Sequence, residues 1–168
     1  MTELARISVA LCLAFAAALA GCSTNEPRIR ATINQSASLT GNLPANPLAW
    51  QVVTSTSDQS RSEMSTLYGN AAAIACARSD VRHDYPAGAV LSLVTWSQTD
   101  DPHYFGARIP STVKSVEFVR VTTTPDGRPS VSYQLYEGAP LHLSFEQPSS
   151  PPTERAAFIL SLRSAVFP

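Results

Sequence analysis

At 168 residues, with 12 Lys and Arg against 13 Asp and Glu, the chain has a formal net charge of −1 at pH 7. That length is enough for one domain with a hydrophobic core, even after removal of an N-terminal leader. Lys114 is the only Lys, and the balanced charge leaves no basic patch. Nucleic acid is therefore excluded as an expected partner.

Residues 1–21 have the features of a bacterial lipoprotein signal peptide. A weakly charged start precedes an uncharged Ala- and Leu-rich run over residues 7–20, and Leu-Ala-Gly stands directly before Cys22. An apolar run of this length indicates export and is too short to span a membrane. The Leu-Ala-Gly-Cys ending resembles the lipobox, in which the Cys is lipidated and becomes the first mature residue. An ordinary signal peptide with a chance Cys is the alternative.

The resemblance to the lipobox implies three acyl chains on Cys22, which exceeds the two signals that stable anchoring needs. We therefore expect a lipid anchor in the bacterial cell envelope. Ser23 stands where an inner-membrane retention signal has Asp, which favours the outer membrane, facing the periplasm. Residues 22–47 are rich in Ser, Thr, Asn and Pro, a composition that predicts a flexible tether before a domain over residues 48–168.

The cysteines leave little room for covalent chemistry in the mature chain. Cys12 leaves with the leader and Cys22 carries lipid, so Cys76 alone remains and no intramolecular disulfide is expected. The chain has no Cys-x-x-Cys-His motif, which excludes the standard covalent attachment of c-type haem, and Cys-rich zinc sites are excluded as well. We expect no metal site, and we expect Cys76, within an Ala-rich stretch, to be a buried apolar side chain.

Alternation and turn signals predict a single α+β domain with a mostly antiparallel β-sheet. Six segments have the character of strands: residues 48–54, 63–68, 89–96, 113–123, 130–136 and 141–145. The stretch between the first two segments, residues 55–62, is predicted to be a polar loop.

Two helices complete the predicted domain. Asn70 is a good N-cap for a short Ala-rich helix over residues 71–78, and Thr153 is expected to cap a C-terminal helix that extends to Val166. A helix that begins at Ser60 competes with the second strand, because Ser60 and Glu63 fit a capping box. The strand is preferred because Gly69 would otherwise lie inside that helix.

The stretch from Tyr85 to Pro110 is the first place to look for a ligand. It joins the most apolar predicted strand to a loop with a His, two aromatic side chains and an Arg. Six residues are candidates for ligand contact: Tyr68, Trp96, His103, Tyr104, Phe105 and Arg108. His titrates near neutral pH, and Arg binds anions through its fork of donors.

Each of these candidates also has a structural alternative. The aromatic residues are typical of core packing, and lone histidines are often packed or surface residues. Arg108 has Asp100, Asp101 and Glu117 as alternative ion-pair partners. No known catalytic motif occurs, so the sequence identifies no catalytic residue.

Residues from about 50 to 121 resemble the cytochrome P460 family. The matching pieces are Glu63-Met64-Ser65-Thr66-Leu67-Tyr68-Gly69-Asn70, then Tyr85-Pro86-Ala87-Gly88-Ala89-Val90, and Tyr104-Phe105-Gly106. The resemblance implies an antiparallel β-domain with helices on one side, often dimeric, so a homodimer is an expected assembly. It also implies an apolar pocket, in which the founding members hold a c-type haem and oxidise hydroxylamine.

The chain departs from the family where the family holds its cofactor. The Cys-x-x-Cys-His motif is absent near the C-terminus, and Leu93 stands where the family has a Lys that cross-links to the haem. Fold can be inherited without function, so we expect a lipid-anchored module without covalent haem that binds a small apolar ligand or has a structural role. Two alternatives remain open: an oxidoreductase or gas-binding protein with non-covalent haem and His103 as axial ligand, and a subunit that acts through a protein partner.

Overall fold

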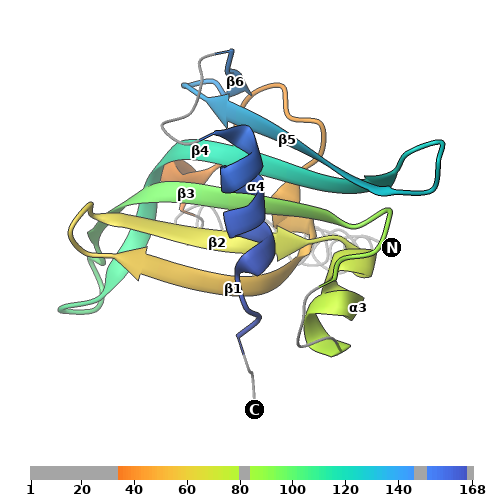
Figure 1. Ribbon diagram of the computed structural model, residues 1–168. Coiled ribbons are helices and arrows are strands. Elements are labelled where there is room, and N and C mark those ends of the chain that lie inside the picture. The colour runs from red at the N-terminus through yellow and green to blue at the C-terminus, as the bar shows by residue number, and fades with distance from the viewer. Residues whose placement is uncertain (1–33, 80–83, 146–150, 166–168) are drawn as a thin grey trace, which may run out of the picture. The chain divides into compact units, whose positions relative to one another are not determined.

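Six antiparallel strands follow one another across a single sheet, each paired with the next in the chain (Figure 1). The computed structural model describes residues 34–79, 84–145 and 151–165, and the unit that contains the sheet begins at Gln35. The predicted α+β class is confirmed. The strands are β1 (Gln51–Asp58), β2 (Glu63–Gly69), β3 (Val90–Asp100), β4 (Arg108–Thr123), β5 (Pro129–Glu137) and β6 (His142–Leu143). The helices are η2 (Gln35–Ala37), η3 (Pro47–Ala49), α3 (Ala71–Ser79) and α4 (Pro152–Ser161).

Side chains alternate between the two faces of this sheet, and both faces carry a hydrophobic cluster. In β3, Leu91 and Leu93 belong to the cluster that includes α3 and α4, and we call this side the helix face. Val94 and Trp96 belong to the other cluster, which residues 37–50 cover, and we call this side the segment face. The period of two along the strands, interrupted where the register shifts between β1 and β2 and between β3 and β4, therefore directs successive side chains to opposite faces.

The helix face is covered by two short helices. The predicted cap of α3 is confirmed, since the Ala73 amide donates to the Asn70 Oδ1 at 3.0 Å, and Cys76 is a free, buried thiol as expected. α4 lies across the front of the sheet in Figure 1. Its N-cap is Pro151, without a side-chain hydrogen bond, so the predicted cap at Thr153 is wrong. Pro152 fixes the helical φ angle of the first turn instead.

The segment face is covered by part of the predicted tether, which is therefore wrong for residues 35–47. Trp96 Nε1 donates to the Ala37 carbonyl at 2.9 Å, which fixes the start of this cover. The Leu141 amide donates to the Thr40 carbonyl at 2.7 Å, which holds its middle. Four apolar side chains of the cover pack on this face: Ala37, Leu39, Leu43 and Ala45. The folded unit thus begins at Gln35, not at residue 48. A few apolar side chains are enough to hold this segment on the sheet, because the sheet itself supplies most of the apolar area that is buried between them.

Two strands are longer than their patterns indicate. β1 continues through Ser55 to Asp58, which was predicted to be loop, because an edge strand with solvent on one side tolerates polar side chains. β4 begins at Arg108, and Glu63 lies in β2, so the alternative helix from Ser60 is not formed. The predicted signal peptide, Cys22 and the first part of the predicted tether lie outside the described residues. No helix in the described ranges has the length and apolar content to cross a bilayer.

Candidate functional site

The six candidate ligand residues do not come together. Tyr68 and Trp96 both belong to the cluster on the segment face. Trp96 is 4% exposed under the N-terminal cover, and burial raises the pKa of the half-buried Tyr68. These two side chains are part of the core, which was their structural alternative.

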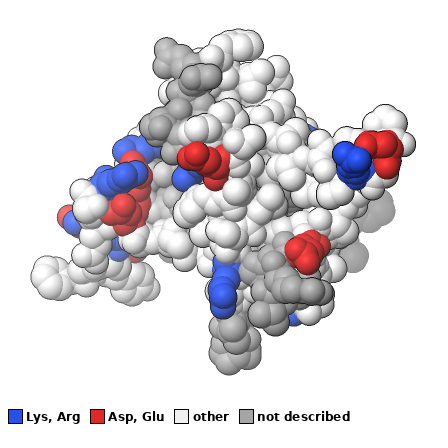
Figure 2. Space-filling model, viewed as in Figure 1, with Lys and Arg blue, Asp and Glu red and all other residues white. Residues whose placement is uncertain are grey.

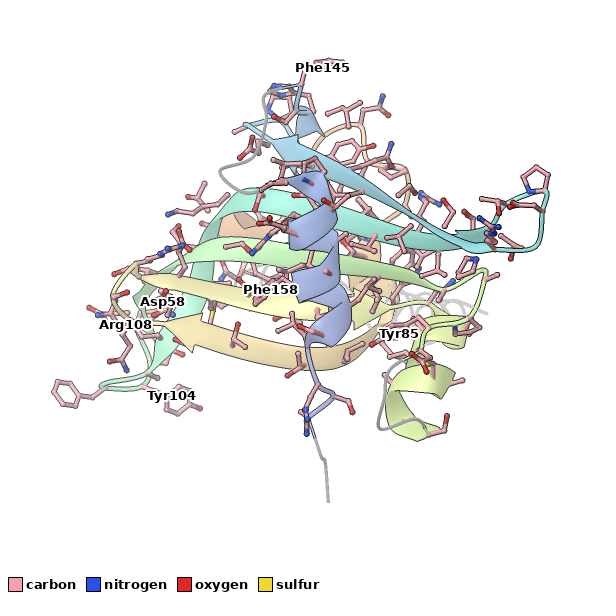
Figure 3. All side chains as sticks on the ribbon, in the orientation of Figure 1. Asp58, Tyr85, Tyr104, Arg108, Phe145 and Phe158 are labelled. Carbon is pink, nitrogen blue, oxygen red and sulfur yellow. The ribbon has the colours of Figure 1, made fainter. Side chains whose placement is uncertain are left out.

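The other four candidates lie in the hairpin loop between β3 and β4 or directly after it. His103 and Phe105 are exposed, and Tyr104, which is 71% exposed, lies away from Phe158, the labelled residue of α4 (Figure 3). Arg108 Nε lies 3.1 Å from Asp100 Oδ1, which is one of the ion pairs considered as its alternative. The six candidates therefore do not line one pocket, and Tyr85, the first residue of the stretch from Tyr85 to Pro110, is buried on the helix face.

A hollow of about 410 Å³ lies instead on the helix face, beside α4. α4 crosses only part of the sheet, and the ends of β1 to β4 on one side of it remain uncovered (Figure 1). Red and blue side chains lie next to one another in this part of the face (Figure 2). The lining residues are Thr56, Asp58, Arg61, Glu63, Ser65, Leu93, Thr95, Lys114, Ser115, Glu137, Arg155, Phe158 and Leu162.

Five of the lining residues form a straight row across the strands. Thr56 pairs with Ser65, Ser65 with Thr95, Thr95 with Ser115, and Ser115 with Glu137. Ser65 Oγ and Thr95 Oγ1 are hydrogen-bonded at 2.9 Å. Each hydroxyl has one donor and two acceptor positions, so this bond leaves most of the capacity of the pair unused. The row offers a ligand four hydroxyls and, at its β5 end, one carboxylate.

A buried ion pair attaches α4 to the sheet and positions one wall of the hollow. Glu117 on β4 is 4% exposed, and it accepts from Arg155 Nε and Nη2, both at 2.7 Å. Tyr133 Oη donates to Glu117 Oε2 at 2.7 Å. The hydrogen bonds to Glu117 raise the pKa of Arg155, and burial raises the pKa of Tyr133. With its charge matched, this pair keeps the first turns of α4 at a fixed place over the strands.

Phe158 forms the apolar part of this wall. It lies one turn after Arg155 on α4, and the Arg155 Cζ lies 4.9 Å from the centre of its ring. The Phe158 side chain is 47% exposed and points over the strands (Figure 3). With Leu93 and Leu162 it gives the hollow a limited apolar surface among polar groups.

Sequence reasoning missed this site, although one signal was present. Glu117 has the same parity along β4 as Val119 and Val121, which face the core. A charged residue at an inward position requires a partner, and Arg155 is the partner that the fold supplies. Glu117 was considered only as a partner of Arg108.

No family model and no curated protein matches this chain. The chemistry of the site is therefore read from its own residues.

The hollow does not fit a haem. His103, the expected axial ligand, lies exposed on the hairpin loop, and no His or Cys lines the hollow. A haem also needs an apolar surround, whereas hydroxyls and charges make up most of the lining. Within residues 34–79, 84–145 and 151–165, no three His, Cys, Asp or Glu side chains gather in a way that would hold a metal ion.

Proposed function

We propose that this protein is a lipid-anchored module of the bacterial cell envelope that binds a small polar ligand in the hollow beside α4. The observation that carries the proposal is the row of four hydroxyls and one carboxylate, from Thr56 to Glu137, that lines the hollow. The volume of the hollow, about 410 Å³, lies in the range of small-molecule sites. The role proposed is binding, because among the described residues no hydroxyl of the row is hydrogen-bonded to a carboxylate or an imidazole that could activate it.

The resemblance to the cytochrome P460 family supports this choice of site. Leu93, which stands at the family's cross-linking Lys, lines the hollow. The C-terminal region, where the family has its Cys-x-x-Cys-His, is α4 in this chain and supplies Arg155 and Phe158 to the opposite wall. The pocket that holds haem in the family is thus proposed to hold a different, polar molecule here. The expected apolar ligand fits less well, because buried hydroxyls and charges would lose their water without a partner.

The anchor is proposed from Leu-Ala-Gly-Cys, and Cys22→Ser tests it. Cells that make the variant should incorporate no labelled fatty acid into it, and the variant should leave the membrane fraction. Labelling of the variant at the level of the native chain would contradict the lipid anchor at this residue.

The binding role is tested with a library of small polar fragments and a substitution that fills the hollow. Thr56 is an exposed residue of the edge strand that lines the hollow, so Thr56→Trp should block the site without disturbing the core. Ser55, its neighbour, bonds to Thr66 on the opposite face, and Ser55→Trp is the matched control. Ligand-detected NMR should give fragments that bind the native chain and Ser55→Trp but not Thr56→Trp.

Equal binding to both variants would place the binding elsewhere and contradict the proposal. The same protein, after addition of haem, should give no Soret band of a coordinated haem. Such a band would support the haem-binding alternative instead.

A further inference from the structure

One carboxylate of the hollow is not paired with a cation among the described residues. Each cation of the lining is paired with a carboxylate: Arg61 with Asp58 at 3.8 Å, Lys114 with Glu63 at 2.7 Å and Arg155 with Glu117 at 2.7 Å. Glu137 also lines the hollow, and its side chain has neither a hydrogen bond nor an ion pair in the described part of the chain. The lining holds three carboxylates and three cations, but Arg155 is engaged by Glu117, which lies outside the lining, so the Glu137 carboxylate is left without a cation.

The nearest basic group along the row does not pair with the Glu137 carboxylate. His142 on β6 pairs with Glu137 in the backbone register. Its Nδ1 lies 3.2 Å from the Pro140 carbonyl oxygen, so the ring is engaged with its own turn. Glu137 is half-buried at the end of β5, next to Ser115, and its carboxylate remains available to a ligand.

The spacing of the row limits the size of a ligand that can contact both the Glu137 carboxylate and the hydroxyls. Neighbouring strands are about 4.8 Å apart, so Glu137 and Thr95, two strands away, are separated by about 10 Å. A molecule with a single ring spans this distance, with a cationic group at one end and hydroxyls at the other. Phe158 and Leu93 lie beside the row and can cover the apolar part of such a ring.

We infer that the ligand of the hollow is a small polyhydroxylated amine, whose ammonium group binds Glu137 and whose hydroxyls bind Ser115 and Thr95. The inference rests on the proposed function and specifies its ligand class. An anion is disfavoured, because every cation in the lining is already paired and Glu137 would repel it. A neutral polyol would leave the Glu137 carboxylate without a charged partner when water is displaced.

Glucosamine, N-acetylglucosamine and glucose are matched probes, because they share a ring with hydroxyls and only glucosamine carries an ammonium group. The full chain in detergent is titrated with each probe at slightly acidic pH, and backbone amide shifts give the affinity and the place of binding. Glucosamine should shift amides of the row and bind about fivefold more tightly than the neutral probes, as a half-exposed ion pair allows. The difference should shrink at high salt.

Glu137→Gln should lower the affinity for glucosamine about fivefold, to that of the neutral probes. Glu154 is an exposed carboxylate on α4 outside the lining, and Glu154→Gln, as the matched control, should leave the affinity unchanged. Equal binding of all three probes, unaffected by Glu137→Gln, would overturn the amine and leave the hollow as a ligand site. Absence of shifts in the row with every probe would also overturn this inference, whereas the proposed function is decided separately by the fragments and Thr56→Trp.

Discussion

The two faces of the sheet are built from alternate side chains of the same strands, yet they are covered in different ways. On the segment face, Val116, Phe118 and Trp96 lie under residues 37–50 and form a closed apolar cluster. On the helix face, α3 and α4 cover the apolar half, and the other half presents hydroxyls and charges. The difference shows that burial of a strand does not by itself mark a site. The proposed site lies where the cover ends and the side chains become polar.

The largest effect should come from removal of the cover on the segment face. Deletion of residues 35–46 would expose Trp96, Phe118 and their neighbours, so we expect a loss of more than about 4 kcal/mol in the free energy of unfolding, or no cooperative unfolding at all. Urea unfolding followed by circular dichroism measures this. Deletion of residues 24–33 is the control and should change the free energy by less than about 1 kcal/mol. Equal effects of the two deletions would mean that residues 35–46 are a tether after all.

Trp96→Ala should destabilise the segment face strongly. The side chain is 4% exposed and its Nε1 is bonded to the cover, so its loss should cost roughly 3–5 kcal/mol through lost burial and a cavity. Phe105→Ala, at the exposed tip of the hairpin loop, is the control and should stay within about 0.5 kcal/mol. A small effect of Trp96→Ala would move this residue from the core to a binding surface.

Removal of the ion pair under α4 should lower the free energy of unfolding less than either of these changes. Arg155→Ala leaves the Glu117 carboxylate buried without its cation, and we expect a loss of about 2–4 kcal/mol, since Arg155 is partly exposed. Arg163→Ala, at an exposed position after α4, is the control and should change little. The double variant Glu117→Leu with Arg155→Leu should be more stable than Arg155→Ala, because it removes both charges. If all three variants had the stability of the native chain, the pair would not hold α4 in place.

Removal of a hydroxyl should change the free energy of unfolding in opposite directions on the two faces. Ser92, on the segment face, is fully buried, and its Oγ has no hydrogen-bond partner among the described residues. Ser92→Ala should therefore raise the free energy of unfolding by up to about 1 kcal/mol. Ser65→Ala removes a hydroxyl that is bonded to Thr95 in the hollow, and it should lower that free energy by about 1 kcal/mol. Thermal unfolding of both variants checks these two predictions. Changes of the same sign in the free energy of unfolding would contradict the contrast between the faces.

Local patterns predicted the elements well and the site poorly. Alternation located most of β2, β3 and β4, and Asn70 marked the start of α3, because these features depend on neighbouring residues. The cover that residues 35–47 form over the sheet was missed, because a count of apolar residues within one segment ignores the apolar area that the sheet offers to that segment. The hydroxyl row was missed because Thr56, Ser65, Thr95 and Ser115 are unremarkable in their own strands. Only the register between the strands brings them together.

The contrast between the faces is tested most directly by the place at which ligands bind. Polar fragments that bind the full chain are titrated, and backbone amide shifts are assigned along the strands. We expect the largest shifts at Ser65, Thr95, Ser115 and Glu137, in the hollow on the helix face. Shifts concentrated around Trp96 and residues 37–50, or at the hairpin loop with Tyr104, would contradict the assignment of the hollow as the ligand site.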